Sequence, residues 1–385
     1  MKKLMTLFLC GMVAAILHAQ ISTSWLSSYE GLSKQASKIR KDFYLGAFAS
    51  GLNPLREDGK EVGEIFKHNF NILTAGIYMS GSQREQGSYN LENVDALVNY
   101  ANSNKIKVYF HPMIGGAIYS PKWLNNGNFS KEELEKIMRD RITTILTRYK
   151  KKVHYVDVVN EALNRGVMTN EGEFDWRTED GTGKNVWMEM GMYQGKKYKF
   201  PQYLVDAFKI CREAGGKKLK LVLHEYANAT TKSSRGITFL NLIKAMKEEG
   251  IPVDDAGIQL HCTIRNGAFS ESGKEPFDFD AFDEMLKMYE EAEIDVHITE
   301  FDIYMPDNPT KADFDLQGEY YAKILQHAIQ SPAVKSFKTW GFTDRNPWNR
   351  SGPEGYPLLL DKQLQPKPAY IKQDEMLKAL VKARK

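Results

Sequence analysis

Short apolar stretches alternate with longer amphipathic stretches along most of the chain. Eight of the apolar stretches are rich in β-branched and aromatic residues and have the length of strands. Between them, apolar residues recur every three or four positions, which is typical of a helix with one buried face. The predicted strands are residues 43–49, 71–78, 107–113, 154–160, 219–225, 256–262, 295–301 and 334–342. The predicted helices are residues 93–104, 131–150, 201–215, 236–250, 279–293 and 318–330.

This alternation predicts an α/β fold in which helices cover both faces of a parallel sheet, because each strand is apolar on both faces. Eight strand–helix units favour a closed (β/α)8 TIM barrel, whose active site lies at the carboxyl ends of the strands. An open doubly wound sheet is the alternative, but no glycine-rich phosphate loop follows the first strand. We expect residues 20–385 to form one catalytic barrel domain without a separate binding module.

The beginning of the chain resembles a leader rather than part of the fold. Lys2 and Lys3 precede an apolar stretch that ends in small residues near Ala19. This is the pattern of a secretory signal peptide, and the stretch is too short to remain as a membrane anchor. We therefore expect residues 1–19 to be removed and the mature protein to be exported to the periplasm or the cell exterior.

Charge and cysteine content narrow the choice of partners. Loss of Lys2 and Lys3 lowers the formal charge from +3 to +1, and no basic stripe remains. This balance argues against nucleic acid or a membrane surface as a partner. Cys211 and Cys262 remain in the mature chain without a CxxC motif, so we expect free buried thiols. We also expect a monomer.

Polar and aromatic side chains close the predicted strands from the third strand onward. Since the carboxyl ends of the strands meet at one mouth of a barrel, these side chains are expected to lie near one another. They are His111, Asn160, Glu161, His224, Glu225, Gln259, His261, Glu300, Asp302, Trp340 and Asp344.

Two of these residues suggest a reaction. Glu161 and Glu300 end the fourth and seventh strands and would face each other across the barrel axis. Glycosidic bond cleavage requires such a pair, one carboxyl as acid and the other as nucleophile or base. Tyr226, Trp340 and Trp348 would offer flat apolar surfaces to sugar rings. Metal binding is the rival use of His and Glu clusters, but HExxH or a comparable spacing is absent from the sequence, and we expect neither metal nor cofactor.

Several segments, in the right order, resemble glycoside hydrolase family 10, the family of retaining endo-β-1,4-xylanases. The resemblance runs from about Tyr44 to Tyr370 and includes both carboxylate segments. The first, VDVVNEAL (156–163), resembles the W-D-V-V-N-E-A block with Val156 in place of Trp, and HITEFD (297–302) resembles I-T-E-L-D. The other matching segments are LVLHEY (221–226), VDDAGIQLH (253–261), WGFTDRNPW (340–348) and PLLLDKQLQPKPAY (357–370).

The resemblance implies a role for each matched residue. Glu161 would be the acid/base and Glu300 the nucleophile. Asn160 would hydrogen-bond the sugar 2-OH, and His261, steadied by Asp302, would orient Glu300. The resemblance also places a set of substrate-binding residues around this pair. These are His111, Tyr226, Gln259, Trp340 and Trp348.

Two segments depart from the family pattern. The stretch TAGIYMSG (74–81) lacks the P-E-N-x-x-K motif that grips the sugar beyond the cleaved residue, and HPMIGGAIYSPKW (111–123) lacks a Trp-His pair. We expect an exported retaining β-glycosidase acting on xylan or a related plant or algal polysaccharide. The losses leave open a different or decorated glycan as substrate, or a catalytically silent glycan-binding barrel. Retention of both carboxylate segments favours activity.

Overall fold

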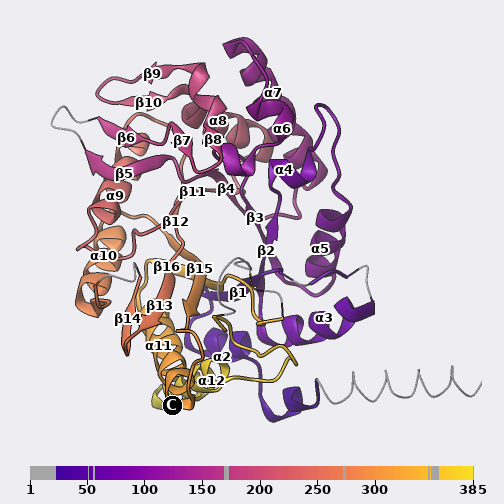
Figure 1. Cartoon of the computed structure of the whole chain (residues 1–385), viewed down its shortest axis with the longest axis vertical. Helices are drawn as coiled ribbons and strands as arrows, with labels where there is room; N and C mark the ends of the chain where they lie inside the picture. The colour runs from indigo at the N-terminus through magenta and orange to yellow at the C-terminus, as the bar shows by residue number, and fades with distance from the viewer. Residues whose placement is uncertain are drawn as a thin grey trace, which may run out of the picture.

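A closed barrel forms the centre of the protein. The computed structural model describes residues 23–50, 52–54, 57–168, 173–271, 275–345, 347 and 355–384. Within these ranges, eight parallel strands surround the barrel axis and helices lie outside them, which confirms the predicted fold (Figure 1). The strands are β1 Tyr44–Phe48, β2 Ile72–Gly76, β3 Lys107–His111, β4 Tyr155–Asn160, β11 Lys220–Glu225, β12 Asp255–Ile258, β15 Val296–Tyr304 and β16 Val334–Thr339.

The strand pairing closes the sheet on itself. From β1 to β16, each barrel strand pairs in parallel with the barrel strand that follows it in sequence, including β12 with β15. The last strand, β16, returns to β1 with Tyr44 opposite Ser336. An open doubly wound sheet would leave two edge strands, and this arrangement leaves none in the barrel. All strands point the same way, so their carboxyl ends meet at one mouth.

Within the described residues the six predicted helices are present, together with three longer helices that the pattern does not predict. The longer helices are α2 Leu32–Ile39, α3 Glu57–Asn69, α5 Glu92–Ser103, α7 Lys131–Arg148, α8 Gln202–Gly215, α9 Ser234–Glu248, α10 Phe279–Glu291, α11 Lys311–Gln330 and α12 Pro368–Ala383. The additional ones are α2, α3 and α12. Short helical turns are η1 Ser24–Ser28, α4 Met79–Ser82, η2 Ala117–Tyr119, α6 Lys122–Asn125 and η3 Val186–Met190.

Two predicted elements have different bounds for identifiable reasons. The predicted sixth strand, 256–262, is interrupted because Leu260 adopts a positive φ of 64°. The chain resumes as β13 (His261–Arg265), which pairs with the end of β15 and with β14 (Ala268–Ser270). The predicted helix 318–330 begins earlier, because Thr310 and Asp313 form a capping box in front of a polar first turn.

A long excursion connects the carboxyl end of β4 to α8. In its described part it forms antiparallel pairs of short strands, visible at the upper left of Figure 1. The pattern of apolar and polar residues does not predict these short strands. The pairs are β5 Leu163–Met168 with β6 Phe174–Trp176, β7 Glu179–Asp180 with β8 Gly183–Lys184, and β9 Met192–Gln194 with β10 Lys199–Pro201.

The barrel has an apolar layer between strands and helices and a partly polar interior. A small interior cluster consists of Ile72, Tyr109 and Val222. Above Tyr109, the ammonium of fully buried Lys338 lies 2.9 Å from the ring centroid. Burial lowers the pKa of Lys338 well below its usual value, against the charges of Asp157 and Glu300. The buried amine of Lys338 therefore interacts electrostatically with Asp157 and Glu300.

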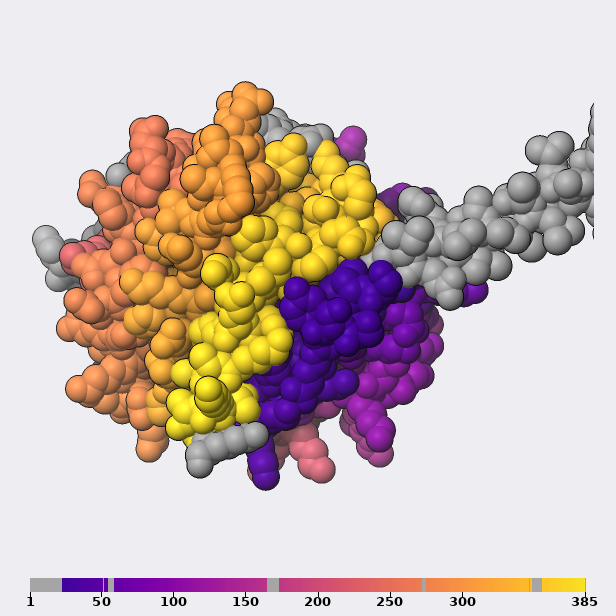
Figure 2. Space-filling model, turned by 90° about the horizontal axis from the view of Figure 1, so that it is seen from below, coloured from indigo at the N-terminus to yellow at the C-terminus, as the bar shows by residue number. Residues whose placement is uncertain are grey.

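The end of the chain completes the outer layer of helices. Figure 2 shows α12 in yellow lying against α2 in indigo, next to the orange of α11. Just before α2, Trp25 of η1 and Tyr29 pack edge-on against Tyr370 of α12. Both cysteines in the described ranges, Cys211 and Cys262, are buried and free, as predicted. No helix in the described part of the chain has the length and apolar character needed to cross a membrane.

Candidate active site

The end of β4 presents the first carboxylate of the site. Asn160 is the last residue of the strand, and Glu161 follows it with a positive φ of 56°. The backbone N–H of Glu161 donates to the carbonyl of His224 at 2.9 Å, which ties the turn to β11. This backbone turn places the Glu161 side chain at the mouth of the barrel, where 15% of it remains exposed.

The second carboxylate, Glu300 on β15, lies among histidines. Its Oε2 is 2.9 Å from Nε2 of His261, while its Oε1 is 3.4 Å from His224 and 3.6 Å from His111. Burial alone would raise the pKa of Glu300, but the hydrogen bond from His261 and the charges of the three histidines outweigh it and lower the pKa. Glu300 is therefore ionised at neutral pH, as a nucleophile must be.

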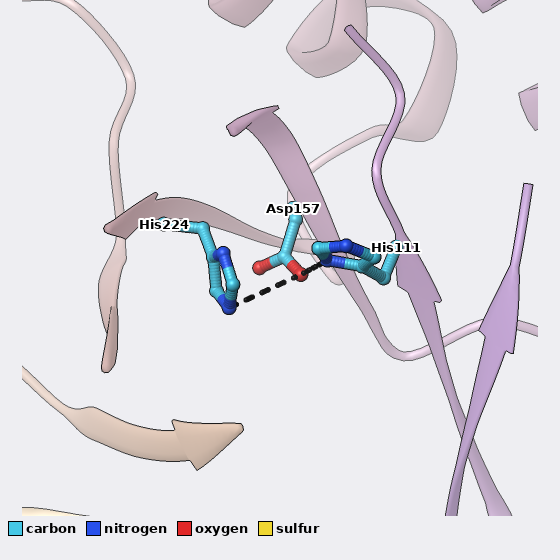
Figure 3. A group of neighbouring side chains, drawn as sticks. All are labelled: His111, Asp157 and His224. Carbon is cyan, nitrogen blue, oxygen red and sulfur yellow. Dashed lines mark hydrogen bonds and ion pairs between the residues drawn. The ribbon is translucent and has the colours of Figure 1, made fainter. Parts of the chain in front are cut away.

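His111 and His224, which both lie near Glu300, gather around Asp157 (Figure 3). Nδ1 of His111 is 2.7 Å from Asp157, and Nε2 of His224 is 4.0 Å from the same carboxylate. Tyr109 also donates to Asp157, at 2.5 Å. One potential ligand atom from each of the three side chains in Figure 3 lies within 4.8 Å of the other two, so the group is a candidate metal site.

The surroundings fit a hydrogen-bond network better than a metal site. His224 has both ring nitrogens engaged, Nδ1 at 2.6 Å from Asn160 and Nε2 at 2.6 Å from Thr299. Burial alone would raise the pKa of Asp157. The charges of His224, His111 and Lys338 and the hydrogen bond with His111 outweigh this effect and lower the pKa. A metal cation here would face Lys338 and displace these bonds, at a cost in free energy.

The amide side chains of Asn160 and Gln259 lie beside His224 and Glu161. The Oδ1 atom of Asn160 accepts from His224, while its Nδ2 is buried and has no hydrogen-bond partner in the described part of the protein. Nε2 of Gln259 donates to Oε1 of Glu161 at 3.0 Å. A buried donor without a partner costs about 1–3 kcal/mol. The free Nδ2 group of Asn160 is thus available to a hydroxyl of a bound sugar.

Aromatic side chains surround Glu161 and Glu300, although not all of them present an open ring face. Trp340 follows β16, stacks on Phe48 with centroids 4.3 Å apart, and meets His111 edge-on at 5.2 Å. Tyr226 follows β11, and the guanidinium of Arg235 lies 3.9 Å from its ring centroid. Trp348, the remaining predicted sugar-binding aromatic residue, lies outside the described residues.

The structure brings three residues to the site that the sequence analysis did not single out. Tyr119 donates to Oε1 of Glu161 at 3.3 Å and stacks on Tyr78 with ring centroids 5.8 Å apart. Arg177 on the long excursion donates from Nη1 to Oε2 of Glu161 at 2.5 Å. Tyr78 and Tyr119 fall inside the two segments that depart from the family pattern, which was the available signal. No feature of the sequence around Arg177 indicated that it would reach the site.

All the other predicted site residues fall in one cluster at the barrel mouth. His261 bridges Glu300 and Asp302, with its ring nitrogens 2.9 Å from an oxygen of each. Among the other strand-end residues, Glu225 is bonded to Arg235 at 2.6 Å and Asp344 to Lys367 at 2.7 Å, in buried ion pairs. These last two carboxylates are therefore structural.

Comparison with known proteins agrees with this geometry. The profile described as glycosyl hydrolase family 10 matches residues 35–375. The chain is 28% identical to endo-1,4-beta-xylanase B of Thermotoga neapolitana over 334 residues, which is 85% of this chain and 86% of the relative. It is 27% identical to endo-1,4-beta-xylanase 2 of Aureobasidium pullulans over 355 residues, or 91% and 90% of the two chains.

Solved structures show the same fold. Native xylanase 10B from Thermotoga maritima superimposes with a TM-score of 0.76 at 28% identity, covering 92% of this chain and all of the other. Xylanase 10B from Thermotoga petrophila RKU-1, solved in complex with xylobiose, gives a TM-score of 0.76 at 27% identity, with 91% and 98% covered. The match spans nearly the whole described chain, and the protein is a glycoside hydrolase that belongs to glycosyl hydrolase family 10.

Proposed function

We propose that the protein cleaves β-1,4-linked xylan or a closely related polysaccharide with retention of configuration. The observation that carries this proposal is the contrast between the two carboxylates. Glu300 is buried and held ionised by three histidines, whereas the Glu161 side chain lies at the mouth of the barrel with 15% of its surface exposed. Similarity to xylanases, one of them solved with xylobiose, supports the choice of substrate.

The first chemical step forms a bond between enzyme and sugar. An oxygen of Glu300 attacks the anomeric carbon while the glycosidic C–O bond breaks. The proton of the Glu161 carboxyl group moves to the departing oxygen, so the leaving sugar is released as an alcohol. The Nδ2 group of Asn160 donates to the 2-OH, and this bond strengthens as positive charge develops on the ring.

The second step returns the enzyme to its starting state. Glu161, now a carboxylate, takes a proton from water as the water oxygen attacks the anomeric carbon. The ester bond to Glu300 breaks, and its electron pair returns to that carboxylate. Glu161 ends protonated, so both carboxyl groups regain their starting forms and the net change is hydrolysis of one glycosidic bond.

A panel of plant and algal polysaccharides tests the function. We expect reducing oligosaccharides from xylan or arabinoxylan with the unmodified protein and none with Glu300→Ala. Glu189→Ala, which removes an exposed carboxylate elsewhere, is the matched control and should retain full activity. Release of products by Glu300→Ala at the unmodified rate would disprove the nucleophile assignment, and binding without products would favour a silent glycan-binding barrel.

A specific observation favours a second candidate, a decorated or non-xylan glycan. The stacked pair of Tyr78 and Tyr119 occupies the region from which the polar groups of the family pattern are missing. Glycines make room for it, because a Cβ on Gly76 would lie 2.8 Å from Tyr78 and one on Gly115 would lie 2.5 Å from Tyr119. Aromatic faces suit the apolar face of a sugar or a methyl substituent better than a row of hydroxyls.

The same panel separates the two candidates. If the tyrosine pair selects the substrate, the unmodified protein should prefer a methylated or branched glycan to linear xylan. Tyr78→Ala should then reduce that preference about two- to tenfold, since one aromatic contact contributes roughly 0.5–1.5 kcal/mol. An unchanged ratio of the two rates would exclude the pair as a specificity determinant.

Export and a monomeric state are also part of the proposal. The predicted leader, residues 1–19, lies outside the described residues, so the support is the sequence pattern. Amino-terminal sequencing of the protein from culture medium and periplasm should find Gln20 first. Light scattering of the purified protein should give the mass of one chain, and a doubled mass would contradict the monomer.

A further inference from the structure

Arg177 forms an ion pair with the proposed acid/base. Nη1 of Arg177 donates to Oε2 of Glu161 at 2.5 Å, and the two side chains are only 13% and 15% exposed. Such a charge-assisted bond, shielded from bulk water, is stronger than a surface ion pair. Burial would lower the pKa of Arg177, but the charge of Glu161 helps raise it instead.

The guanidinium is held from several sides. Its second terminal nitrogen donates to the hydroxyl of Tyr226 at 2.8 Å, and its carbon lies 5.2 Å from the centroid of that ring. The Tyr226 ring in turn lies against Arg235, which is paired with Glu225. The backbone of Arg177 is fixed by its N–H, which donates to the carbonyl of Ala162 at 2.8 Å. Arg177 is thus positioned by the fold to face Glu161.

Besides Arg177, several other ionisable groups lie near Glu161. Tyr119 from the loop after β3 donates to Glu161, and burial keeps its phenol protonated. The carboxylates of Glu225 and Glu300 oppose a negative charge on Glu161, although the first is neutralised by Arg235. The groups facing this part of the site are Tyr78, Tyr119, Arg177, Glu225, Tyr226 and Glu300, with Asp180 behind Arg177.

The two chemical steps place opposite demands on Glu161. Attack by Glu300 needs a proton on Glu161, whereas hydrolysis of the intermediate needs the carboxylate. An adjacent cation stabilises the carboxylate in both states of the enzyme. Arg177 should therefore oppose the first step at high pH and assist the second step at low pH.

We propose that Arg177 is a positioning residue that favours the carboxylate form of Glu161, limiting formation of the glycosyl-enzyme at high pH and promoting its hydrolysis at low pH. This inference rests on the proposed acid/base role of Glu161. It assigns to the long excursion after β4 a part in setting the pH range of the enzyme.

Titration of Glu161 itself is the direct test. The carboxyl carbons of glutamate are labelled with 13C in the full-length mature protein, and the Glu161 signal is assigned by its absence in Glu161→Gln. In Arg177→Met, which keeps length but removes charge, the midpoint of Glu161 should rise by about one pH unit. Arg177→Lys, which keeps the charge, should leave the midpoint near its original value. Lys184→Met, which removes an exposed charge on β8, is the matched control.

Kinetics give a second readout. In Arg177→Met, the basic limb of kcat/KM for an oligosaccharide should move upward by about one unit. For an aryl glycoside with an activated leaving group, where the second step limits turnover, kcat should fall about tenfold at acid pH. A uniform loss at all pH values, with the Glu161 midpoint unchanged, would overturn the proposal. Arg177→Gln serves the same test if Arg177→Met does not fold.

The failure of this inference is distinguishable from failure of the proposed function. The titration does not require turnover, so it reports on the ion pair even if no glycan is cleaved. An inactive unmodified protein would overturn the proposed function, whereas an unshifted midpoint in an active enzyme would overturn only the role of Arg177.

Discussion

Nε2 of His261 lies 2.9 Å from Oε2 of Glu300, and the opposite ring nitrogen lies 2.9 Å from Asp302. Burial would lower the pKa of His261, but the charge and hydrogen bond of Asp302, with a further contribution from Glu300, raise it to about 10. The ring therefore carries a positive charge at neutral pH. A carboxylate–imidazolium–carboxylate chain thus holds Glu300, the proposed nucleophile, in place and keeps it ionised.

Removal of the imidazolium should weaken the nucleophile in a pH-dependent way. In His261→Asn, we expect kcat/KM to fall roughly 100-fold, a loss comparable to that of other positioned polar catalytic groups. The acid limb should also move upward by about one unit, because a nearby cation no longer lowers the pKa of Glu300. The pH dependence of kcat/KM measures both effects. A uniform loss with the acid limb in place would mean that His261 acts only through orientation.

Because of His261, the free energy of unfolding should also vary with pH in the alkaline range. Its folded-state pKa of about 10 lies above the ordinary value of 6.5, so its contribution to stability is complete below pH 6.5 and is lost as pH rises toward 10. We expect the free energy of unfolding to decline across this window, as measured by urea denaturation at several pH values. In His261→Asn the decline should be smaller, and an equal decline in both proteins would contradict this account.

Glu300 imposes the opposite dependence at acid pH. Its folded-state pKa is lowered from 4.5, so its contribution is present above that value and disappears as pH falls through the folded pKa. Acid unfolding should therefore begin at higher pH in Glu300→Gln than in the unmodified protein if the ionised form contributes to stability. Circular dichroism between pH 5 and about pH 2 follows this transition. If the two proteins unfold at the same pH, the free-energy cost of burying the Glu300 charge equals the gain from pairing it with the histidines.

Loss of the acid should depend on the leaving group. In Glu161→Ala, activated aryl glycosides should still form the glycosyl-enzyme, because their leaving groups need no proton. Natural linkages should be cleaved slower by a factor of about 10²–10⁴. Parallel measurements of kcat/KM on both substrate types test this, with Glu189→Ala as the control. Equal losses on both substrates would contradict an acid/base role.

Much of the barrel could be predicted from the sequence because its elements follow simple periods. Strands apolar on both faces and helices with one apolar stripe define eight units, and the strand ends then locate the polar cluster. The interruption at Leu260 was not visible, because a positive φ in a leucine has no compositional sign. The helix start at Lys311 was missed because its first turn is polar and has no apolar face to detect.

The missed site residues have a common physical cause. Arg177 reaches Glu161 across 16 positions through short strands in an excursion that has no clear periodicity. The pairing of such strands depends on tertiary contacts rather than on local pattern. Tyr78 and Tyr119 come from different loops, and only the folded barrel brings their rings together. Sequence comparison indicated what those loops lack, and the structure was needed to identify what they present instead.

The strand-end carboxylate Asp344 illustrates how position alone can mislead. It follows β16 at the mouth of the barrel, but Nζ of Lys367 lies 2.7 Å from its Oδ2 and both side chains are buried. The same ammonium donates to the carbonyls of Tyr356 and Leu358, at 2.6 and 2.7 Å. The pair therefore fastens the segment before α12 to the end of the barrel, and its role is structural.

Removal of one member of this pair should destabilise the fold without a specific effect on catalysis. In Asp344→Ala a buried ammonium loses its counter-ion, and the expected cost is about 3–5 kcal/mol. Urea denaturation measures that loss, while kcat of the folded fraction should stay within about threefold of the original, since no contact among the described residues joins this pair to Glu161 or Glu300. The double variant Asp344→Leu/Lys367→Met should recover part of the stability, because it removes both buried charges. Loss of kcat in Asp344→Ala with stability unchanged would instead place Asp344 in the catalytic machinery.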